Sequence, residues 1–247
     1  MIERPGGDHV HQPAASAEVL ARNLKALSRC SPETAQLVEQ SIAAPDAGFA
    51  IAEDGGLTGT IGTGDTTRRL ASGRRPLDEA KRLADRFVTA EAGVAVVLGL
   101  GVGHHIRLLA EKLGRTGVVV VFEPDVPLLR AVLERVDLAE VMERSNVAVL
   151  TRPDSGAISE ALLGAEVAVS LGVKVIEHGP SGPRLGERAA QFREAFTTTV
   201  RAIRTNVVTT LMQTEASLRN GLMNLDWYAS VPGIAGLSAR RAGRRWS

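Results

Sequence analysis

Cysteine and aromatic residues are scarce in this sequence. Cys30 is the only cysteine among 247 residues, which excludes an intramolecular disulfide and a cysteine-rich metal site. Aromatic residues make up 3% of the chain, so the core must be built from Val, Leu, Ile and Ala, as in helix-covered parallel sheets. The formal net charge is +1, and charge of this size does not favour nucleic acid or an anionic membrane surface as a partner.

Long hydrophobic runs are also missing. No stretch approaches about 18 consecutive apolar residues, the length that a transmembrane helix requires. The N-terminus, MIERPGGDHVHQP, has acids and prolines where a signal peptide would have its apolar core. Hydrophobic residues nevertheless make up 44% of the chain, enough for a substantial core. We therefore expect a cytoplasmic globular protein with no nucleic-acid or membrane partner.

Residues 1–75 contain two helical patterns followed by a strand pattern. The first helix is expected after Ser16 as its N-cap, and the second after Ser31, with Pro32 at its first position. Next comes GFAIAEDGGLTGTIGTG, in which apolar residues alternate with small or polar ones on both sides of a DGG turn. This region is predicted to be a helical pair and a β-hairpin.

Residues 76–178 alternate between short apolar runs and helical patterns. The predicted strands are VAVVLGLG, GVVVVFEPD, NVAVL and GVKVIEHG. The predicted helices are PLDEAKRLADRFVTAE, HHIRLLAEKLG, VPLLRAVLERVD and ISEALLGA. Strands and helices that alternate at this range indicate right-handed βαβ crossovers and a parallel sheet covered on both faces. The fold class is therefore predicted to be α/β, with a Rossmann-like core.

Residues 179–247 have no strand pattern. The segment GPSGP is interpreted as a strand-to-helix connection. Apolar residues then recur at steps of three, four and seven from Phe192 to Leu225, which predicts one very long helix or two helices broken near Asn220-Gly221. Such a stripe would run about 50 Å, longer than a four-stranded core can cover. We therefore expect its distal half to be exposed in the isolated chain, and to be covered by a further domain or by self-association. The distal residues are Leu211, Leu218, Leu222 and Leu225.

A glycine turn joins the first predicted parallel strand to the helix that follows it. Its glycines are Gly99, Gly101 and Gly103. Closely spaced glycines at a helix N-terminus let backbone N–H groups approach an anion or a cofactor. The spacing is G-x-G-x-G, with His104 at the third glycine position of the dinucleotide motif, which disfavours NAD or FAD. We expect this loop at the carboxyl end of a central strand.

Glu123 ends the next strand, roughly twenty residues past the loop, where such folds often bind ribose hydroxyls. Loop and acid together resemble the nucleoside site of methyltransferases that use S-adenosylmethionine, so that compound or a nucleotide is the candidate ligand. Those enzymes usually carry an acid two residues before the first glycine, where this chain has Val97. His104 and His105 either face the ligand as neutral donors or are one buried and one solvated residue. No metal site is predicted.

Four segments resemble the motility accessory factor (Maf) and 6-hydroxymethylpterin diphosphokinase MptE-like family, between about Gly73 and Leu225. They are ASGRRPLDEAKRLADRF, VVLGLGVGHHIRLL, VFEPDVPLLRAVL and RTNVVTTLMQTEASLRNGLMNL. The best matches are the glycine turn, the motif formed by Glu123, Pro124 and Asp125, and the pair Asn220 and Asn224. The family commonly has an aromatic residue after the last glycine, where this chain has His104.

The resemblance implies a Rossmann-like region in front of a second α/β domain, which is the transferase. Members of the family are linked to glycosylation of flagellin with nonulosonic acids such as pseudaminic acid, and its archaeal branch to diphosphate transfer onto a hydroxymethyl pterin. The resemblance adds Asp125 to the candidate ligand-binding residues and flagellin to the candidate partners. The second domain of the family begins with an AGPSL-type loop, which we do not find here. We therefore expect this chain to lack the catalytic domain.

Three functions remain open on the sequence. The chain is a Rossmann-like module of a Maf/MptE-like transferase, a methyltransferase that uses S-adenosylmethionine, or a non-catalytic interaction module whose glycine turn is structural. The acid missing at Val97 counts against the methyltransferase. The exposed stripe expected on the long helix favours the other two.

Overall fold

The computed structural model describes residues 13–144 and 146–230. The chain forms two compact units, of which the first extends to Ile203 and the second begins at Arg204. Boundaries at residues 75 and 178 stay predictions, and both fall inside the first unit. Among the described residues, no helix combines the length and the apolar composition needed to cross a membrane.

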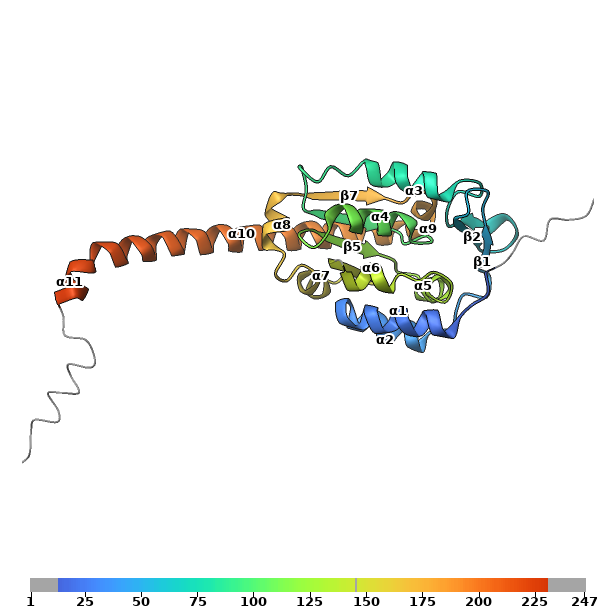
Figure 1. Ribbon diagram of the computed structural model, residues 1–247, viewed down its shortest axis with the longest axis horizontal. Coiled ribbons are helices and arrows are strands. Elements are labelled where there is room, and N and C mark those ends of the chain that lie inside the picture. Colours follow the sequence, from blue (N-terminus) through green and yellow to red (C-terminus); the bar gives the residue numbers. More distant parts are fainter. Residues whose placement is uncertain (1–12, 145, 231–247) are drawn as a thin grey trace, which may run out of the picture. The chain divides into compact units, whose positions relative to one another are not determined.

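A four-stranded parallel sheet forms the centre of the first unit, as expected for the α/β class (Figure 1). Its strands are β4 (Val94–Leu98), β5 (Val118–Phe122), β6 (Asn146–Leu150) and β7 (Val173–Glu177). Their order in the sheet is β6-β5-β4-β7. All five residues of β4 and of β5 are buried, because helices cover both faces. This burial on two sides explains why both strands are continuous apolar runs in the sequence.

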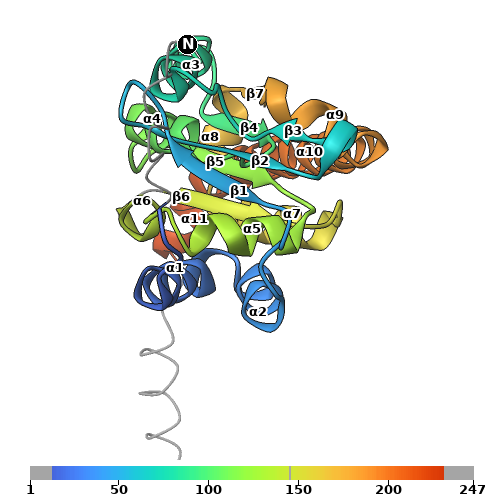
Figure 2. The same ribbon diagram turned by 90° about the vertical axis from the view of Figure 1, so that its right-hand side faces the viewer.

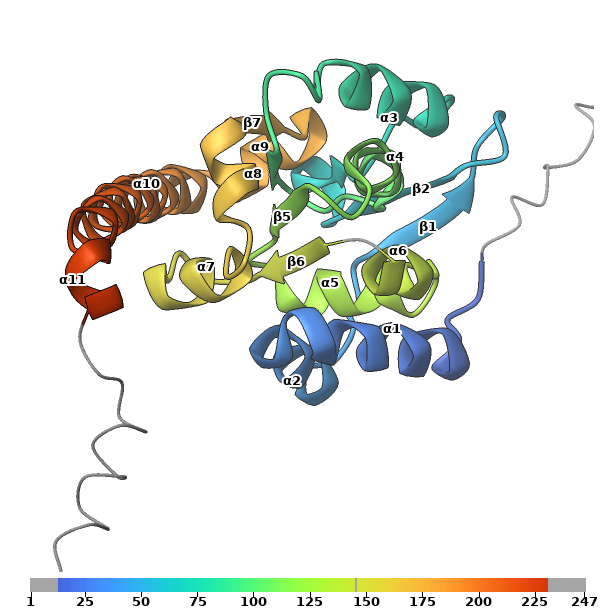
Figure 3. The ribbon, with the colours of Figure 1, turned by 60° about the vertical axis from the view of Figure 1, so that its left-hand side comes forward.

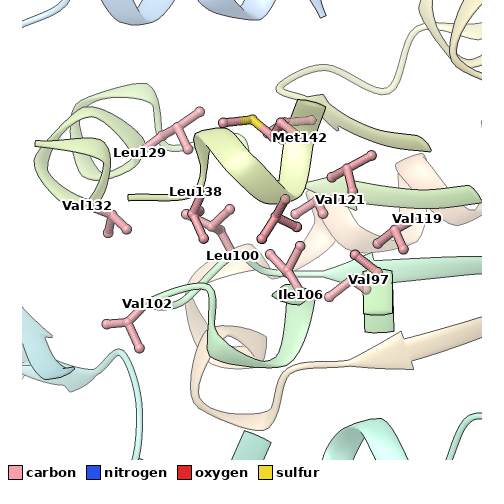
Figure 4. Close-up of a cluster of buried hydrophobic side chains, with 14 of the residues drawn as sticks. Val97, Leu100, Val102, Ile106, Val119, Val121, Leu129, Val132, Leu138 and Met142 are labelled. Carbon is pink, nitrogen blue, oxygen red and sulfur yellow. The ribbon is translucent and has the colours of Figure 1, made fainter. Parts of the chain in front are cut away.

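Two helical layers cover the sheet, and alternate strand residues point to each. Val97, Val119 and Val121 belong to the cluster that packs under α4, α5 and α6 (Figure 4). Val96, Val120 and Phe122 belong to the cluster on the opposite face, under α7, α8 and the long helix α10 (Glu187–Met223). The helices are α3 (Pro76–Asp85), α4 (His104–Leu113), α5 (Val126–Leu133), α6 (Ala139–Arg144), α7 (Ser155–Ala161), α8 (Glu166–Leu171) and α9 (Gly182–Leu185). Helices α6 and α8 were not predicted from the sequence.

The two N-terminal helices, α1 (Ala17–Cys30) and α2 (Pro32–Gln40), lie beside α5 and α6 (Figure 3). The expected N-cap of α1 is confirmed, since the Ser16 hydroxyl accepts the N–H of Val19. Ser31 takes the expected N-cap position of α2, directly before Pro32, but its side chain makes no capping hydrogen bond to the helix. Its hydroxyl oxygen accepts the N–H of Val149, and the Thr34 hydroxyl donates to the Val149 carbonyl oxygen. These side chains therefore satisfy backbone groups of β6, a strand at the edge of the sheet.

A small antiparallel sheet lies near the end of the parallel sheet to which the β7 arrow points (Figures 1 and 2). The predicted hairpin is confirmed as β1 (Gly48–Ile51) paired with β2 (Leu57–Ile61). Gly55 supplies the positive φ, 77°, that its turn requires. A third strand, β3 (Arg68–Arg69), pairs with β2 and was not predicted. Its two arginines are exposed, so the pairing uses the backbone and leaves no apolar pattern.

One long helix, α10 (Glu187–Met223), follows α9. It is continuous through Asn220-Gly221, so the sequence alternative of two helices broken there is excluded. A short helix, α11 (Leu225–Ser230), follows it. In the first unit α10 packs under the sheet, where the Phe192 ring stacks on Phe122 with their centroids 4.2 Å apart. Beyond Ile203, in the second unit, Leu211 and Leu218 are each 64% exposed, as expected for the distal stripe.

Candidate functional site

The glycine turn lies where the order of the parallel strands reverses. It follows β4, whose neighbours are β5 on one side and β7 on the other. Glu123 follows β5 directly, which confirms that the loop and this acid end adjacent strands. The loop after β7, beginning at His178, reaches the same edge of the sheet. Ligands of open α/β sheets usually bind at such a reversal point, beyond the carboxyl ends of the strands.

All three glycines of the turn have positive φ angles: 99° at Gly99, 54° at Gly101 and 84° at Gly103. Glycine adopts these angles without strain, whereas most other residues do not. The space beside each glycine is already occupied. A Cβ atom at Gly99 would overlap the Ser181 side chain, and one at Gly101 would lie 2.5 Å from Cε1 of His178.

The space beside the other parts of the turn is filled as well. A Cβ atom at Gly101 would also lie 2.7 Å from the Leu70 carbonyl oxygen, and one at Gly103 would lie 3.1 Å from Leu138. The glycines therefore leave room for protein groups from the segment after β3, from the loop after β7 and from the segment before α6. In this conformation, the space that side chains at these positions would need is filled by other parts of the protein.

Glu123 is the most deeply buried acid of the site, with 0% of its side chain exposed. Its Oε1 and Oε2 atoms accept hydrogen bonds of 2.6 Å from Nη1 and Nη2 of Arg184. The backbone N–H groups of Leu100 and Asp125 donate to the same two oxygens, at 3.1 and 3.2 Å. Both carboxylate oxygens are therefore occupied by donors from the chain itself.

Arg184 comes from α9, 61 residues after Glu123, and 14% of its side chain is exposed. Burial alone would lower the pKa of this guanidinium, but the hydrogen bonds and the charge of Glu123 outweigh it and raise the pKa. The pair is thus a bidentate, charge-assisted contact between the guanidinium and the carboxylate. Removal of either partner would leave a buried charge alone.

Asp125, the further residue suggested by the family resemblance, begins α5. Its Oδ1 atom accepts the N–H of Leu128 at 3.1 Å, which makes it the N-cap of this helix. Its Oδ2 atom lies 3.6 Å from Nη1 of Arg184, and 28% of the side chain is exposed. Asp125 therefore lies next to the Glu123–Arg184 pair and closer to solvent than Glu123.

The two histidines of the turn have separate contacts. His104 is partly buried, and its Nε2 atom donates to the Leu57 carbonyl oxygen at 2.9 Å, which ties the turn to the small sheet. His105 is buried, and its Nε2 atom donates to the Gly99 carbonyl oxygen at 3.2 Å. The His105 ring stacks on that of His178, with centroids 4.5 Å apart and planes 11° from parallel. One alternative left open by the sequence was that one of the two histidines is buried and the other solvated. His105 is buried, but His104 is only partly exposed.

Burial lowers the pKa of both stacked imidazoles, to about 4 at His105 and to about 2 at His178. The neighbouring charge of Arg184, and the second imidazole, lower the pKa of His178 further. Both rings are therefore neutral at physiological pH. A neutral ring can donate one hydrogen bond and accept another, which matches the carbonyl contact of His105.

Ser181 and His178 form a hydroxyl–imidazole pair, with Oγ and Nδ1 2.8 Å apart. A serine hydroxyl next to an imidazole is the arrangement that activates a nucleophile in acyl transfer. Here, however, 1% of Ser181 and 3% of His178 are exposed, and Ser181 fills the space beside Gly99. A substrate cannot reach the hydroxyl in this conformation. The pair therefore closes the reversal point of the sheet.

His178, Ser181 and Arg184 are the site residues that sequence reasoning missed. All three belong to the segment around GPSGP, which was interpreted only as a connection between a strand and a helix. The segment does connect β7 to α10, through a 3₁₀ turn at Gly179–Ser181 and then α9. The strand order would have revealed its role, because it places the loop after β7 directly beside the glycine turn.

The sequence matches no protein-family model and no curated protein. Among solved structures, the chain can be superposed on one described as the MAf glycosyltransferase from Magnetospirillum magneticum AMB-1. The TM-score is 0.46 and the sequence identity 19%, over 74% of this chain. The chain covers 35% of the length of that protein, so the activity of the whole glycosyltransferase is not thereby assigned to it.

Proposed function

We propose that this chain is the Rossmann-like module of a Maf-type transferase and that it acts in assembly rather than in the chemical step. The four segments that resemble the Maf and MptE-like family support the first part. The observation that carries the second part is the bidentate contact between Glu123 and Arg184 at the reversal point of the sheet. Transfer of a sugar to flagellin, or of diphosphate to a pterin, would then belong to another domain.

The Glu123–Arg184 contact weighs against a nucleoside site for a specific reason. In the predicted site, Glu123 would accept hydrogen bonds from the two ribose hydroxyls. Both of its oxygens instead accept from Arg184 and from backbone N–H groups. A ribose could take the place of Arg184 only after the guanidinium had moved away from Glu123. That movement would leave the buried carboxylate without its counter-ion, which is unfavourable.

A nucleotide or S-adenosylmethionine bound by the predicted residues would need a second conformation. Ser181 and His178 would have to leave the spaces beside Gly99 and Gly101. Arg184, which belongs to the same segment, would leave Glu123 in the same movement. The competing proposal is that a ligand binds at Gly99–Gly103, His104, Glu123 and Asp125. It predicts that the ligand cannot bind while the segment with His178, Ser181 and Arg184 occupies the site.

Calorimetric titration of the protein with S-adenosylmethionine and with a panel of nucleotides tests the two proposals. We expect no saturable binding. Saturable one-to-one binding that is lost in Glu123→Gln would overturn the assembly role and support the ligand site. Glu177→Gln is the matched control, since Glu177 also ends a strand of the sheet but is exposed.

A Gly101 variant would not be a good test of ligand binding at the turn. A side chain there would collide with His178 and with the Leu70 carbonyl oxygen, and the φ of 54° would be strained. Gly101→Val would therefore damage the fold whether or not the turn binds a ligand. Glu123→Gln keeps the shape of the side chain but leaves the Arg184 charge without its partner, so circular dichroism of this variant must show that it is folded before its titration is compared with that of the wild type.

A further inference from the structure

The second unit presents exposed apolar side chains at helical spacing along α10, followed by Leu225 at the start of α11. They include Val208, Leu211, Leu218, Leu222 and Leu225, each of which is more than half exposed. Their spacings are three, seven, four and three residues. Glu215 lies in the seven-residue interval between Leu211 and Leu218. Together with Glu215, the five apolar residues occupy the a and d positions of consecutive heptads, the pattern by which one helix packs along another. We call these six residues the heptad row.

A shallow groove of about 510 Å³ runs beside the heptad row. It is lined by Thr210, Gln213, Thr214, Ser217 and Gly221, together with the row residues Leu218 and Leu222. Helices pack when the ridge of one enters the groove of the other. This surface offers a ridge and a groove side by side, so it can pack against a copy of itself.

The heptad row is also symmetric when its direction is reversed. If a second copy runs antiparallel, with the two-fold axis between Ala216 and Ser217, every member of the row meets another member. Val208 then lies opposite Leu225, Leu211 opposite Leu222, and Glu215 opposite Leu218. A two-fold interface requires this kind of self-complementary surface.

The charges of the row favour the same direction. In a parallel, in-register pair the two Glu215 carboxylates would face each other at the centre, and like charges at that distance repel. In the antiparallel pair each Glu215 is displaced from the other and lies near Arg219 of the second copy. Both residues are exposed in the single chain and so are accessible to such a contact.

We propose that residues 208–225 form an antiparallel helix pair with a second copy of this chain. The proposal deepens the assembly role proposed above, on which it rests, by naming the partner. The helix pair can be refuted without refuting the assembly role. A chain that binds no nucleotide and stays monomeric would refute the helix pair, while the absence of nucleotide binding would still agree with the assembly role. Nucleotide binding by a dimeric chain would refute the assembly role instead.

Sedimentation velocity of the full chain over about a hundredfold range of concentration is the first test, since a reversible dimer dissociates on dilution. We expect a monomer–dimer equilibrium in the wild type. Leu218→Glu combined with Leu222→Glu should weaken dimerisation by about 100-fold or more, because it places unpaired charges in an apolar contact. The matched control is Ala216→Glu with Asn220→Glu, which adds the same charges at the same spacing on the opposite side of the helix.

The control should dimerise as the wild type does. Circular dichroism of both double variants checks that the helix and the first unit remain folded. A wild-type chain that is monomeric at every concentration overturns the proposal. So does a control that weakens dimerisation as much as the row variant, because the effect would then come from net charge.

Cysteine cross-linking tests the direction of the helices. In a Cys30→Ser background, we expect Val208→Cys chains mixed with Leu225→Cys chains to form disulfide-linked heterodimers. Neither variant alone should cross-link, because residue 208 lies about 25 Å from its own copy in the antiparallel pair, at 1.5 Å per residue. Cross-linking of each variant with itself would indicate a parallel pair and overturn the proposal.

Discussion

At the scale of single residues, the candidate site contains a buried ion pair formed by Glu123 and Arg184. Replacing Arg184 by Met leaves the fully buried carboxylate without a counter-ion, and loss of one partner of such a pair typically costs about 3–5 kcal/mol. We expect chemical denaturation of Arg184→Met to show a loss of this size. The double variant Arg184→Met with Glu123→Gln should recover a large part of it, since no charge is then buried alone.

An exposed ion pair of the same length is the control for this measurement. Arg193 and Glu177 also lie 2.6 Å apart, but about half of each side chain is in contact with solvent. Arg193→Met should therefore cost less than about 1 kcal/mol. Equal losses in the two arginine variants would show that burial of Glu123 does not make its pair special.

The stacked imidazoles of His105 and His178 predict a dependence of stability on pH. Both have a pKa below the ordinary value of 6.5 in the folded protein, about 4 and about 2. The unfolded chain therefore binds more protons below pH 6.5, and the free energy of unfolding falls as the pH decreases from there toward 4. Each histidine contributes up to about 1.4 kcal/mol per pH unit in this window.

Urea denaturation at a series of pH values from 7.5 to 4.5 measures that slope, in steps of about half a pH unit. We expect stability to be constant above the ordinary histidine pKa and to fall below it. His178→Gln should flatten the slope, since one of the two buried groups can no longer titrate. A slope unchanged in His178→Gln would contradict the prediction for this residue.

At the scale of elements, the edge of the parallel sheet depends on two side chains from the start of α2. The Thr34 hydroxyl donates to the Val149 carbonyl oxygen at 2.6 Å in a buried contact. Thr34→Val keeps the shape and removes the donor, so we expect a loss of about 1–3 kcal/mol in the free energy of unfolding. Thr197→Val is the control: Thr197 donates to the Arg193 carbonyl oxygen in a solvent-exposed contact on α10, and the loss of stability in this variant should be close to zero.

The central strands β4 and β5 were predictable from the sequence because each is buried on both faces and is therefore a continuous apolar run. The edge strand β7 is only partly buried and includes the charged residues Lys174 and Glu177. The glycine turn was predictable for a similar reason, since strand, glycines and helix follow one another without interruption. Helices α6 and α8 are six residues each and too short for a helical period to stand out. The strand β3 has only two residues, both arginines, whose pairing is entirely through the backbone.

The filling of the candidate site could not be predicted in the same way. Glu123 and Arg184 are 61 residues apart, and no local pattern joins them. The contact of His104 with Leu57 spans 47 residues and depends on where the small sheet packs. Sequence periodicity describes how an element is buried, whereas these contacts depend on which loops meet when the strand order reverses. The glycine turn and Glu123 were thus located correctly at one edge of the sheet, whereas the groups that contact them come from distant segments.

At the scale of the whole molecule, the two units differ in how far their large apolar residues are buried. The last residue of α10 that is buried in the first unit is Val200, and the large apolar residues of the second unit described above are exposed. Isolated helices in water are only marginally stable, because tertiary packing supplies most of the stability of a helix. The second unit should therefore open locally far more often than the first.

Limited proteolysis with trypsin makes this difference measurable. In dilute protein we expect the first cuts after Arg204 or Arg219, which are exposed in the second unit, and a resistant fragment that retains the first unit. Because the buried clusters on both faces of the sheet end by Ile203, this fragment should melt within a few degrees of the intact chain. Cleavage after Arg219 should slow as the concentration rises, since a helix pair would protect residues 208–225, and the Leu218→Glu, Leu222→Glu variant should lose this protection. Simultaneous digestion of both units, or a fragment that melts far below the intact chain, would mean that the second unit contributes to the stability of the first.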